Sequence, residues 1–205
     1  MAARPWNHNI HYYPVVLAAV PDGAARGLDV GCGDGMLARE LRRLMPEVTA
    51  IDRDGPSLHA ARAADDGLGI DYLLGDFLGH DLAPGSFDFI SSVAALHHMD
   101  AAAALRRMRD LLRPGGRLAI IGCASLGGVR DLPAEVGGIV AHRVHRLGRQ
   151  YLEVTAPTVW PPSETYVGMR RIARDLLPGA IFRRRLLWRY SLIWTKPDPT
   201  PRSVV

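Results

Sequence analysis

A glycine-rich loop follows a short apolar run near the start of the chain. Residues 27–30 predict a strand, glycines occupy positions 31, 33 and 35, and leucines at helical spacing follow within residues 36–45. A strand that passes through glycines into a helix suits a nucleotide, because the backbone can approach the ligand and the first helical N–H groups lack partners. The acidic residue that such sites use for ribose hydroxyls comes about 20 residues later, where this chain has Asp52.

Two ligand classes use this geometry, and the loop departs from the pattern of one of them. Dinucleotide sites place a third glycine three positions after the second, but that position here is Met36. Asp29 and Asp34 also put carboxylates beside the loop. Carboxylates oppose a pyrophosphate and suit a cationic ligand, so the loop does not favour a nicotinamide oxidoreductase.

The loop and four later segments resemble, in order, the motifs of class I S-adenosylmethionine (SAM)-dependent methyltransferases. Residues 28–35 are similar to the first motif, and Asp52 is similar to the acidic residue that binds the SAM ribose. Gly75-Asp76-Phe77 is similar to the motif that contacts the adenine. Residues 87–98 resemble the fourth strand with its turn, and residues 111–118 resemble the turn into the fifth strand. The match covers roughly residues 27–122.

This resemblance implies SAM as the cofactor, and no metal is expected. An aromatic N-terminal segment would cover the cofactor, with His11 or Tyr12 reaching its carboxylate. The residues expected to bind SAM are His11, Tyr12, Asp29, Gly31, Cys32, Gly33, Gly35, Asp52, Arg53, Asp76, Phe77, Ser92 and Val93.

Two adjacent histidines, His97 and His98, follow the fourth expected strand. Catalytic residues gather at this end of open α/β sheets, and a general base assists transfer to a hydroxyl or a protonated amine. His97 is the first candidate for the base and His98 the second. The alternative is that His97 only shapes the substrate site, because alignment of the acceptor alone supplies much of the rate.

Alternating strands and helices predict an α/β fold, a doubly wound and mostly parallel seven-stranded sheet with a C-terminal antiparallel hairpin. We expect one domain over residues 1–205, with an N-terminal lid at 1–24 and a cap insertion at 125–162. The expected strands are residues 27–30, 48–51, 70–74, 87–92, 117–122, 180–188 and 190–194, and the expected helices are residues 36–45, 55–64, 101–112, 133–147 and 163–177.

The cap holds His142 and His145, which lie three apart on one helical face. They could form a metal pair, but no third ligand is evident, so surface histidines are the favoured interpretation. Trp160-Pro161-Pro162 could form a wall of an acceptor pocket.

The composition is that of an ordinary globular protein, with 48% hydrophobic and 22% charged residues. The two cysteines cannot form a metal cluster or a disulfide framework. No apolar run reaches the length of a membrane span, and the N-terminus lacks the features of a signal peptide, so we expect a cytoplasmic protein. Residues 1–105 carry a net charge of −7 and residues 106–205 one of +11. Because the arginines are dispersed, a solvated face is favoured over a nucleic-acid site.

The sequence therefore predicts methyl transfer from SAM to a small-molecule acceptor, by a monomer or homodimer. One alternative is a protein that binds SAM without transferring the methyl group, because the two properties are separable. A nucleic-acid methyltransferase is a weaker alternative, since the Pro-Pro-Tyr clamp typical of that class is absent after the fourth strand, where residues 91–94 read Ser-Ser-Val-Ala.

Overall fold

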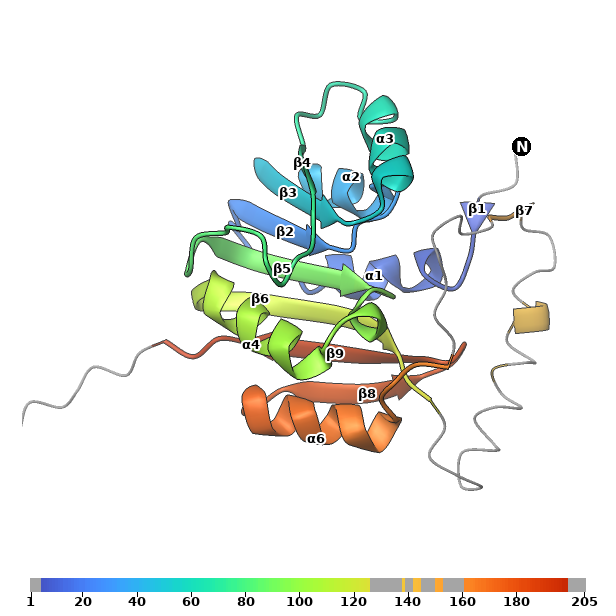
Figure 1. The fold of residues 1–205 in the computed structure, drawn as a ribbon, viewed down its shortest axis with the longest axis vertical. Coiled ribbons are helices and arrows are strands. Elements are labelled where there is room, and N and C mark those ends of the chain that lie inside the picture. Colours follow the sequence, from blue (N-terminus) through green and yellow to red (C-terminus); the bar gives the residue numbers. More distant parts are fainter. Residues whose placement is uncertain (1–4, 126–137, 139–141, 145–149, 153–160, 199–205) are drawn as a thin grey trace, which may run out of the picture.

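A mixed sheet forms the centre of the computed structural model, which describes residues 5–125, 138, 142–144, 150–152 and 161–198 (Figure 1). Within these residues the sheet has seven strands in the order β4-β3-β2-β5-β6-β9-β8. They are β2 (Arg26–Val30), β3 (Glu47–Asp52), β4 (Asp71–Leu74), β5 (Phe87–Val93), β6 (Leu112–Cys123), β8 (Ile181–Arg185) and β9 (Arg189–Thr195). The first five are parallel. Strands β2, β3 and β4 follow one another toward one edge of the sheet, and β5 and β6 then continue from the other side of β2 toward the opposite edge. In open α/β sheets, ligands bind at the strand ends beside such a change of direction.

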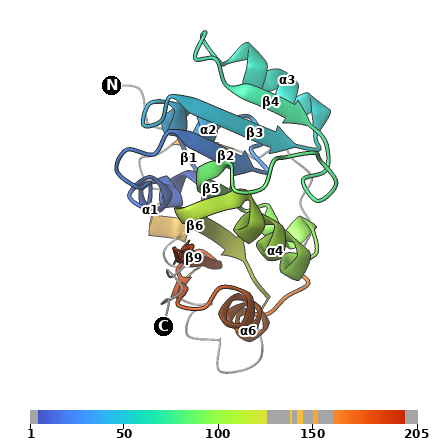
Figure 2. The ribbon, with the colours of Figure 1, turned by 90° about the vertical axis from the view of Figure 1, so that its left-hand side faces the viewer.

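Helices cover both faces of the sheet, as the resemblance predicts (Figure 2). Helices α1 (Tyr13–Leu17), α2 (Met36–Arg42) and α3 (Gly55–Ala63) share one buried cluster with Ala119 and Ile121 of β6. Helices α4 (Ala101–Leu111) and α6 (Tyr166–Leu176) share the other cluster with Leu118 and Ile120. Successive side chains of a strand point to opposite faces, so β6 contributes to both layers of the core.

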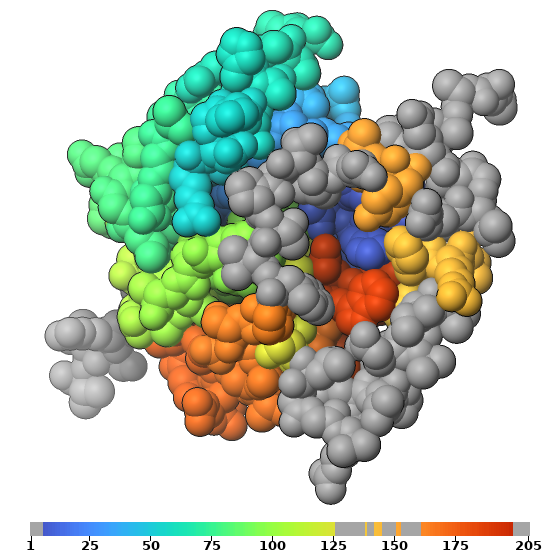
Figure 3. All heavy atoms as spheres, turned by 45° about the vertical axis from the view of Figure 1, so that its right-hand side comes forward, coloured from blue at the N-terminus to red at the C-terminus, as the bar shows by residue number. Residues whose placement is uncertain are grey.

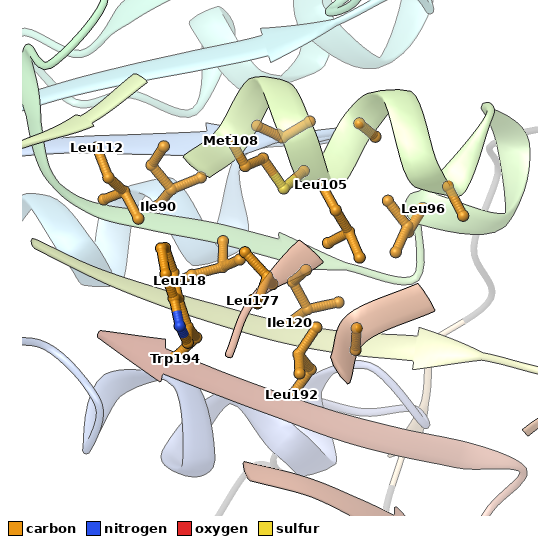
Figure 4. Packing of buried hydrophobic residues seen from close by; sticks show 14 of the residues in the cluster. Ile90, Leu96, Leu105, Met108, Leu112, Leu118, Ile120, Leu177, Leu192 and Trp194 are labelled. Carbon is orange, nitrogen blue, oxygen red and sulfur yellow. The ribbon is translucent and has the colours of Figure 1, made fainter. Parts of the chain in front are cut away.

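The larger core cluster lies between α4 and the middle of the sheet (Figure 4). Leu105 and Met108 of α4 pack over Ile90 of β5, and both helical side chains are fully buried. Full burial of one such side chain is worth about 1.5–3 kcal/mol. This packing fixes β5 against α4, and so positions the residues that follow the carboxyl end of the strand.

Side-chain caps begin three of the helices. Asp54 accepts a hydrogen bond from the Ser57 backbone N–H at 3.0 Å, and Asp100 caps α4 in the same way. Thr165 caps α6 by accepting from the Gly168 N–H at 3.0 Å. The sequence places the start of this last helix at Ser163, two residues before the cap that the structure uses.

Strand β6 begins earlier than the sequence predicts. The segment 113–116, expected to be only a turn, is the first part of the strand, with an irregular register against β5. The Gly115 N–H donates to the Lys196 carbonyl at 2.9 Å, so the extended tail holds this segment in the sheet. Asp88 supports the same end of the sheet, where its carboxylate accepts from the backbone N–H groups of Ala25 and Arg26 and pairs with Arg113.

The C-terminal hairpin forms as expected. Strands β8 and β9 pair antiparallel, and β9 also pairs antiparallel with β6, where Arg189 lies opposite Cys123. Leu187 and Trp188 in the connecting turn have φ angles of 56° and 57°. This left-handed conformation shortens the first expected strand, which ends at Arg185.

A second, two-stranded sheet joins the N-terminal segment to the region after β6. Strand β1 (Pro5–Trp6) pairs parallel with β7 (Gln150–Tyr151). Most of the helix expected over residues 133–147, together with His145 and Trp160, lies outside the described residues. No helix within the described ranges is both long and apolar enough to cross a membrane.

Candidate active site

A cavity of about 490 Å³ opens at the carboxyl ends of β2, β3, β4 and β5. This volume is within the range of small-molecule and cofactor sites. The described residues that line it are Asn7, Asn9, Tyr13, Asp29, Gly31, Cys32, Gly33, Asp34, Met36, Leu37, Ile51, Asp52, Arg53, Asp54, Ser57, Gly75, Asp76, Phe77, Leu78, Val93, Ala94, Ala95, His98, Met99 and Leu152.

The glycine loop after β2 forms one wall of this cavity. A side chain at Gly31 would place its Cβ 2.1 Å from the Cβ of Ala95, so only glycine fits there. Gly35 has a φ of 72° at the start of α2, where an added Cβ would lie 2.8 Å from the Tyr72 hydroxyl, and it is not among the described residues that line the cavity. Gly33 has open space at its Cβ position and faces the cavity.

Asp52 lies at the end of β3 and holds the glycine loop from the opposite side. One carboxylate oxygen accepts from the Gly33 N–H at 2.7 Å, and the other accepts from the Asp54 N–H at 2.9 Å. A carboxylate has about four lone-pair sites, so two remain for ribose hydroxyls. Arg53, the next residue, also lines the cavity and is exposed.

Asp29 is almost fully buried beneath the loop. The Ser91 hydroxyl donates to it at 2.7 Å. Burial raises its pKa to about 7, the Ser91 hydrogen bond opposes this rise, and the charge of Asp52 adds to it. A cation in the cavity would favour the ionised carboxylate. Cys32 also lines the cavity, and burial raises the pKa of its thiol, which stays neutral.

The segment after β4 lines the far side of the cavity. Asp76 is exposed there and accepts from the Leu78 N–H at 2.9 Å. Phe77 is buried, and the Arg107 guanidinium lies 5.4 Å from the centre of its ring. An exposed carboxylate beside a fixed aromatic edge is the arrangement that the adenine motif requires.

The end of β5 contributes backbone and small side chains. Val93, Ala94 and Ala95 line the cavity, and Ala94 has a φ of 54° that turns the chain across the opening. Ser92 is fully buried, and its hydroxyl donates to the Val30 carbonyl at 3.0 Å. Within the described residues Ser92 does not line the cavity, so of the two residues expected here only Val93 does.

The two histidines face different spaces. His98 lines the main cavity, whereas His97 lines a second cavity of about 10 Å³ with Cys123 and Glu164. Their ring centres are 4.1 Å apart, and each has a buried Nδ1 without a hydrogen-bond partner in the described part of the chain. Of the two candidates for the general base, the second, His98, thus lines the main cavity, while the first, His97, faces the smaller one, because successive residues of η2 (Leu96–His98) point in different directions.

Both imidazoles are held in the neutral form. Burial lowers the pKa of His97 to about 4, and the charges of His98 and Arg189 lower it further. Burial also lowers the pKa of His98, as does Arg53, while Asp52 opposes the shift. His98 is thus close to the residues expected to hold the ribose, and His97 is close to Arg189.

The N-terminal segment covers the cavity, but with residues other than those expected. Tyr12 points away and donates its hydroxyl to the Leu186 carbonyl at 2.8 Å, and His11 stacks edge-on against Tyr12. Neither lines the cavity among the described residues; Asn9 and Tyr13 do. The cause is the 3-10 turn η1 (Ile10–Tyr12), which spaces side chains by a third of a turn.

Asn7 explains how this segment is held. Its side-chain oxygen accepts from the N–H groups of Asn9 and Ile10 at 2.9 and 2.8 Å, and so begins η1. Its amide nitrogen donates to the Leu152 carbonyl at 3.4 Å. An asparagine side chain that bonds the backbone two and three residues later forms an Asx-type turn, for which asparagine is a local sequence signal.

His142 contacts the N-terminal segment. It lies 2.8 Å from His8 in a hydrogen bond between ring nitrogens. Its expected partner His145 lies outside the described residues. Within the described ranges, no three metal-binding side chains form a group.

Comparison with known proteins agrees with the motifs. The sequence profile of the methyltransferase domain matches residues 28–120. An uncharacterized methyltransferase of Mycobacterium tuberculosis is 40% identical over 198 residues, which cover 95% of this chain and 98% of that protein. A ubiquinone biosynthesis O-methyltransferase of Xanthomonas euvesicatoria is 41% identical over 100 residues, 46% of this chain and 41% of its own length.

Solved structures share the fold at low identity. The N-methyltransferase NodS of Bradyrhizobium japonicum, in complex with S-adenosylhomocysteine (SAH), has a TM-score of 0.62 at 15% identity, over 92% of this chain and 87% of that chain. The phosphoethanolamine N-methyltransferase 2 of Haemonchus contortus, also with SAH, has a TM-score of 0.66 at 16% identity, over 92% of this chain and 53% of that chain. The 40% identical relative and the domain profile, with the glycine loop, the carboxylate at the end of β3 and the shared fold, show that the chain belongs to the class I SAM-dependent methyltransferases.

Proposed function

We propose that this enzyme transfers the SAM methyl group to a small-molecule acceptor. The observation that carries the proposal is the cavity, whose walls at β2, β3 and β4 provide cofactor groups while its wall at β5 and the N-terminal segment provides space and polar side chains. The small-molecule names of the relatives, a ubiquinone biosynthesis O-methyltransferase among them, support this class of acceptor. We propose that the chain acts as one domain, in which Asn7, Asn9 and Leu152 are described residues that line the cavity from outside the seven-stranded sheet.

The cofactor residues divide by the part of SAM that each fits. Asp52 has free lone pairs for the ribose hydroxyls, and Asp76 with Phe77 fits the adenine. The loop at Gly31 and Gly33 brings the backbone against the methionine end. Asp29, buried beneath the loop, supplies negative charge toward a cationic cofactor.

When bound, SAM supplies an electrophilic methyl group on a sulfonium. The acceptor atom forms a bond to the methyl carbon as the carbon–sulfur bond breaks, and the electron pair stays on sulfur in SAH. The protein must hold the acceptor in line, which accounts for much of the rate of such a transfer. Val93, Ala94 and Tyr13 form the part of the cavity wall that fits this task.

His97 is our proposed general base, and His98 a residue of the cofactor's ribose side. His97 is uncharged at neutral pH and lies toward β6 and β9, away from Asp52. A pKa near 4 makes it a weak base, because the best catalytic pKa lies close to the working pH. Alignment therefore contributes more to the rate than proton removal.

Mass spectrometry tests the proposal. The protein is incubated with methyl-¹³C SAM and a metabolite extract of the cells in which it occurs, and labelled small molecules are sought. We expect at least one product heavier by a labelled methyl group, together with SAH. Binding of SAM by calorimetry without any labelled product would instead support a protein that binds SAM and does not transfer the methyl group.

A further inference from the structure

Arg189, the first residue of β9, is a partly buried cation that pairs with no carboxylate among the residues that the structure describes. Its Nη2 donates to the Asn9 side-chain oxygen at 2.9 Å, and its Nη1 donates weakly to the Leu187 carbonyl at 3.4 Å. Its Nε is buried and has no hydrogen-bond partner in the described part of the chain.

The surroundings of Arg189 leave its charge uncompensated. Its field helps to lower the pKa of His8 to about 4, after burial and ahead of His142, and it also lowers that of His97. His8 and His97 are therefore neutral and do not balance the positive charge of Arg189. Burying a charge without a partner costs free energy, so such a residue is expected where a ligand supplies the partner.

Arg189 is not among the described residues that line the cavity, but it lies next to one of them and near a second. It pairs with Cys123 at the end of β6, two residues beyond Ile121, which pairs with the cavity residue Val93. Neighbouring strands are about 4.8 Å apart, so a long side chain spans the distance to the end of β5. Asn9, which Arg189 contacts, itself lines the cavity. Figure 3 shows the N-terminal segment and the turn before β9 side by side on this face.

We propose that Arg189 binds an anionic group, a carboxylate or a phosphate, on the acceptor. This inference rests on the proposed function and specifies its substrate class. A guanidinium binds such groups through two parallel N–H donors, and Nε with one Nη is a common pair. In Arg189 that pair would be Nη2, which already bonds Asn9, and Nε, which is buried and lacks a hydrogen-bond partner among the described residues. A neutral acceptor would leave it unpaired.

The test uses the full chain, the variant Arg189→Gln and the control Arg183→Gln, whose arginine is exposed on β8. The metabolite extract is separated on an anion-exchange resin, and both fractions are incubated with methyl-¹³C SAM. We expect labelled products from the retained, anionic fraction. We expect Arg189→Gln to raise KM for the purified acceptor at least tenfold, because one charge-assisted contact is worth about 1.5–3 kcal/mol, with SAH affinity close to that of the wild type. Phosphatase treatment of the retained fraction distinguishes a phosphate from a carboxylate.

Labelled products from the unretained fraction alone, or an unchanged KM in Arg189→Gln, would overturn the inference and leave the proposed function intact. A direct measurement covers the case in which neither fraction is labelled, which would reject the proposed function. Inorganic phosphate and acetate are titrated into the SAH-loaded protein at constant ionic strength. We expect at least one of them to raise the melting temperature of the wild type and of Arg183→Gln but not of Arg189→Gln. Equal responses of all three proteins to both anions would overturn the anion site.

Discussion

The two sides of the cavity are built in different ways. The cofactor side, formed by the ends of β2, β3 and β4, uses backbone groups and short side chains from nearby segments, such as the bond between Gly33 and Asp52. The side that we propose for the acceptor, formed by Asn9, Tyr13 and the end of β5 with Arg189 nearby, uses side chains from opposite ends of the chain. Arg189 and Asn9, for example, are 180 residues apart. A fixed cofactor side and an adjustable acceptor side let one fold act on different substrates.

Gly31→Ala tests most severely whether backbone geometry fixes the cofactor side. The new Cβ would lie 2.1 Å from that of Ala95, at a φ of 72° that disfavours any side chain. We expect a loss of about 3 kcal/mol in the free energy of unfolding, combining overpacking with backbone strain. Urea denaturation measures it.

Gly33→Ala is the matched control, because it has a positive φ of 55° but nothing within 4 Å of its Cβ position. Backbone strain alone should cost it about 1 kcal/mol. Equal losses in the two variants would show that the contact with Ala95 does not constrain the loop.

His97→Ala and His98→Ala test whether His98 belongs to the cofactor side of the cavity and His97 to the proposed acceptor side. We expect His97→Ala to lower turnover about 10²-fold, the low end for a general base because its pKa is only about 4. KM for SAM should not change. We expect His98→Ala to raise KM for SAM instead, since His98 lines the cofactor cavity. Steady-state kinetics would contradict this division if both variants changed the same parameter.

Folding shifts the pKa values of His97 and Asp29 in opposite directions, so the two groups should change the free energy of unfolding with pH in opposite directions. The pKa of His97 falls from 6.5 to about 4 on folding, so between these values the unfolded chain binds the extra proton and stability rises with pH. The pKa of Asp29 rises from 3.8 to about 7, so over that interval the folded chain binds the extra proton and stability falls with pH.

In the wild type the two effects oppose each other, so its free energy of unfolding should change less with pH than that of a variant lacking either group. We expect Asp29→Asn to make stability rise more steeply between pH 4.5 and 6.5, and His97→Gln to make it rise less. Urea denaturation across this range measures both, and parallel curves for all three proteins would contradict the assigned pKa shifts.

The same division explains what the sequence could predict. The strands, the glycine loop and Asp52 were predictable because local periodicity and a fixed spacing determine them. The roles of His97 and His98 were not, since one residue of rotation in η2 exchanges the spaces that they face. The choice of Tyr13 over Tyr12 depends in the same way on the η1 turn, although Asn7 carried a local turn signal.

Arg189 could not be identified from the sequence at all. It is one of many arginines in the basic half of the chain, and nothing local distinguishes it from Arg183 or Arg184. Its position becomes meaningful only when β9 pairs with β6 and the N-terminal segment folds across the same edge. Long-range contacts of this kind carry no short sequence pattern.

A crossed kinetic measurement tests the central claim, that one side of the cavity binds SAM and the other selects the acceptor. KM for SAM and KM for the acceptor are measured in Asp52→Asn and Arg189→Gln. The account predicts that Asp52→Asn raises only KM for SAM, at least tenfold because a charge-assisted hydrogen bond is weakened, and that Arg189→Gln raises only KM for the acceptor. If each variant raised both constants equally, the two sides would not be separate and the account would be contradicted.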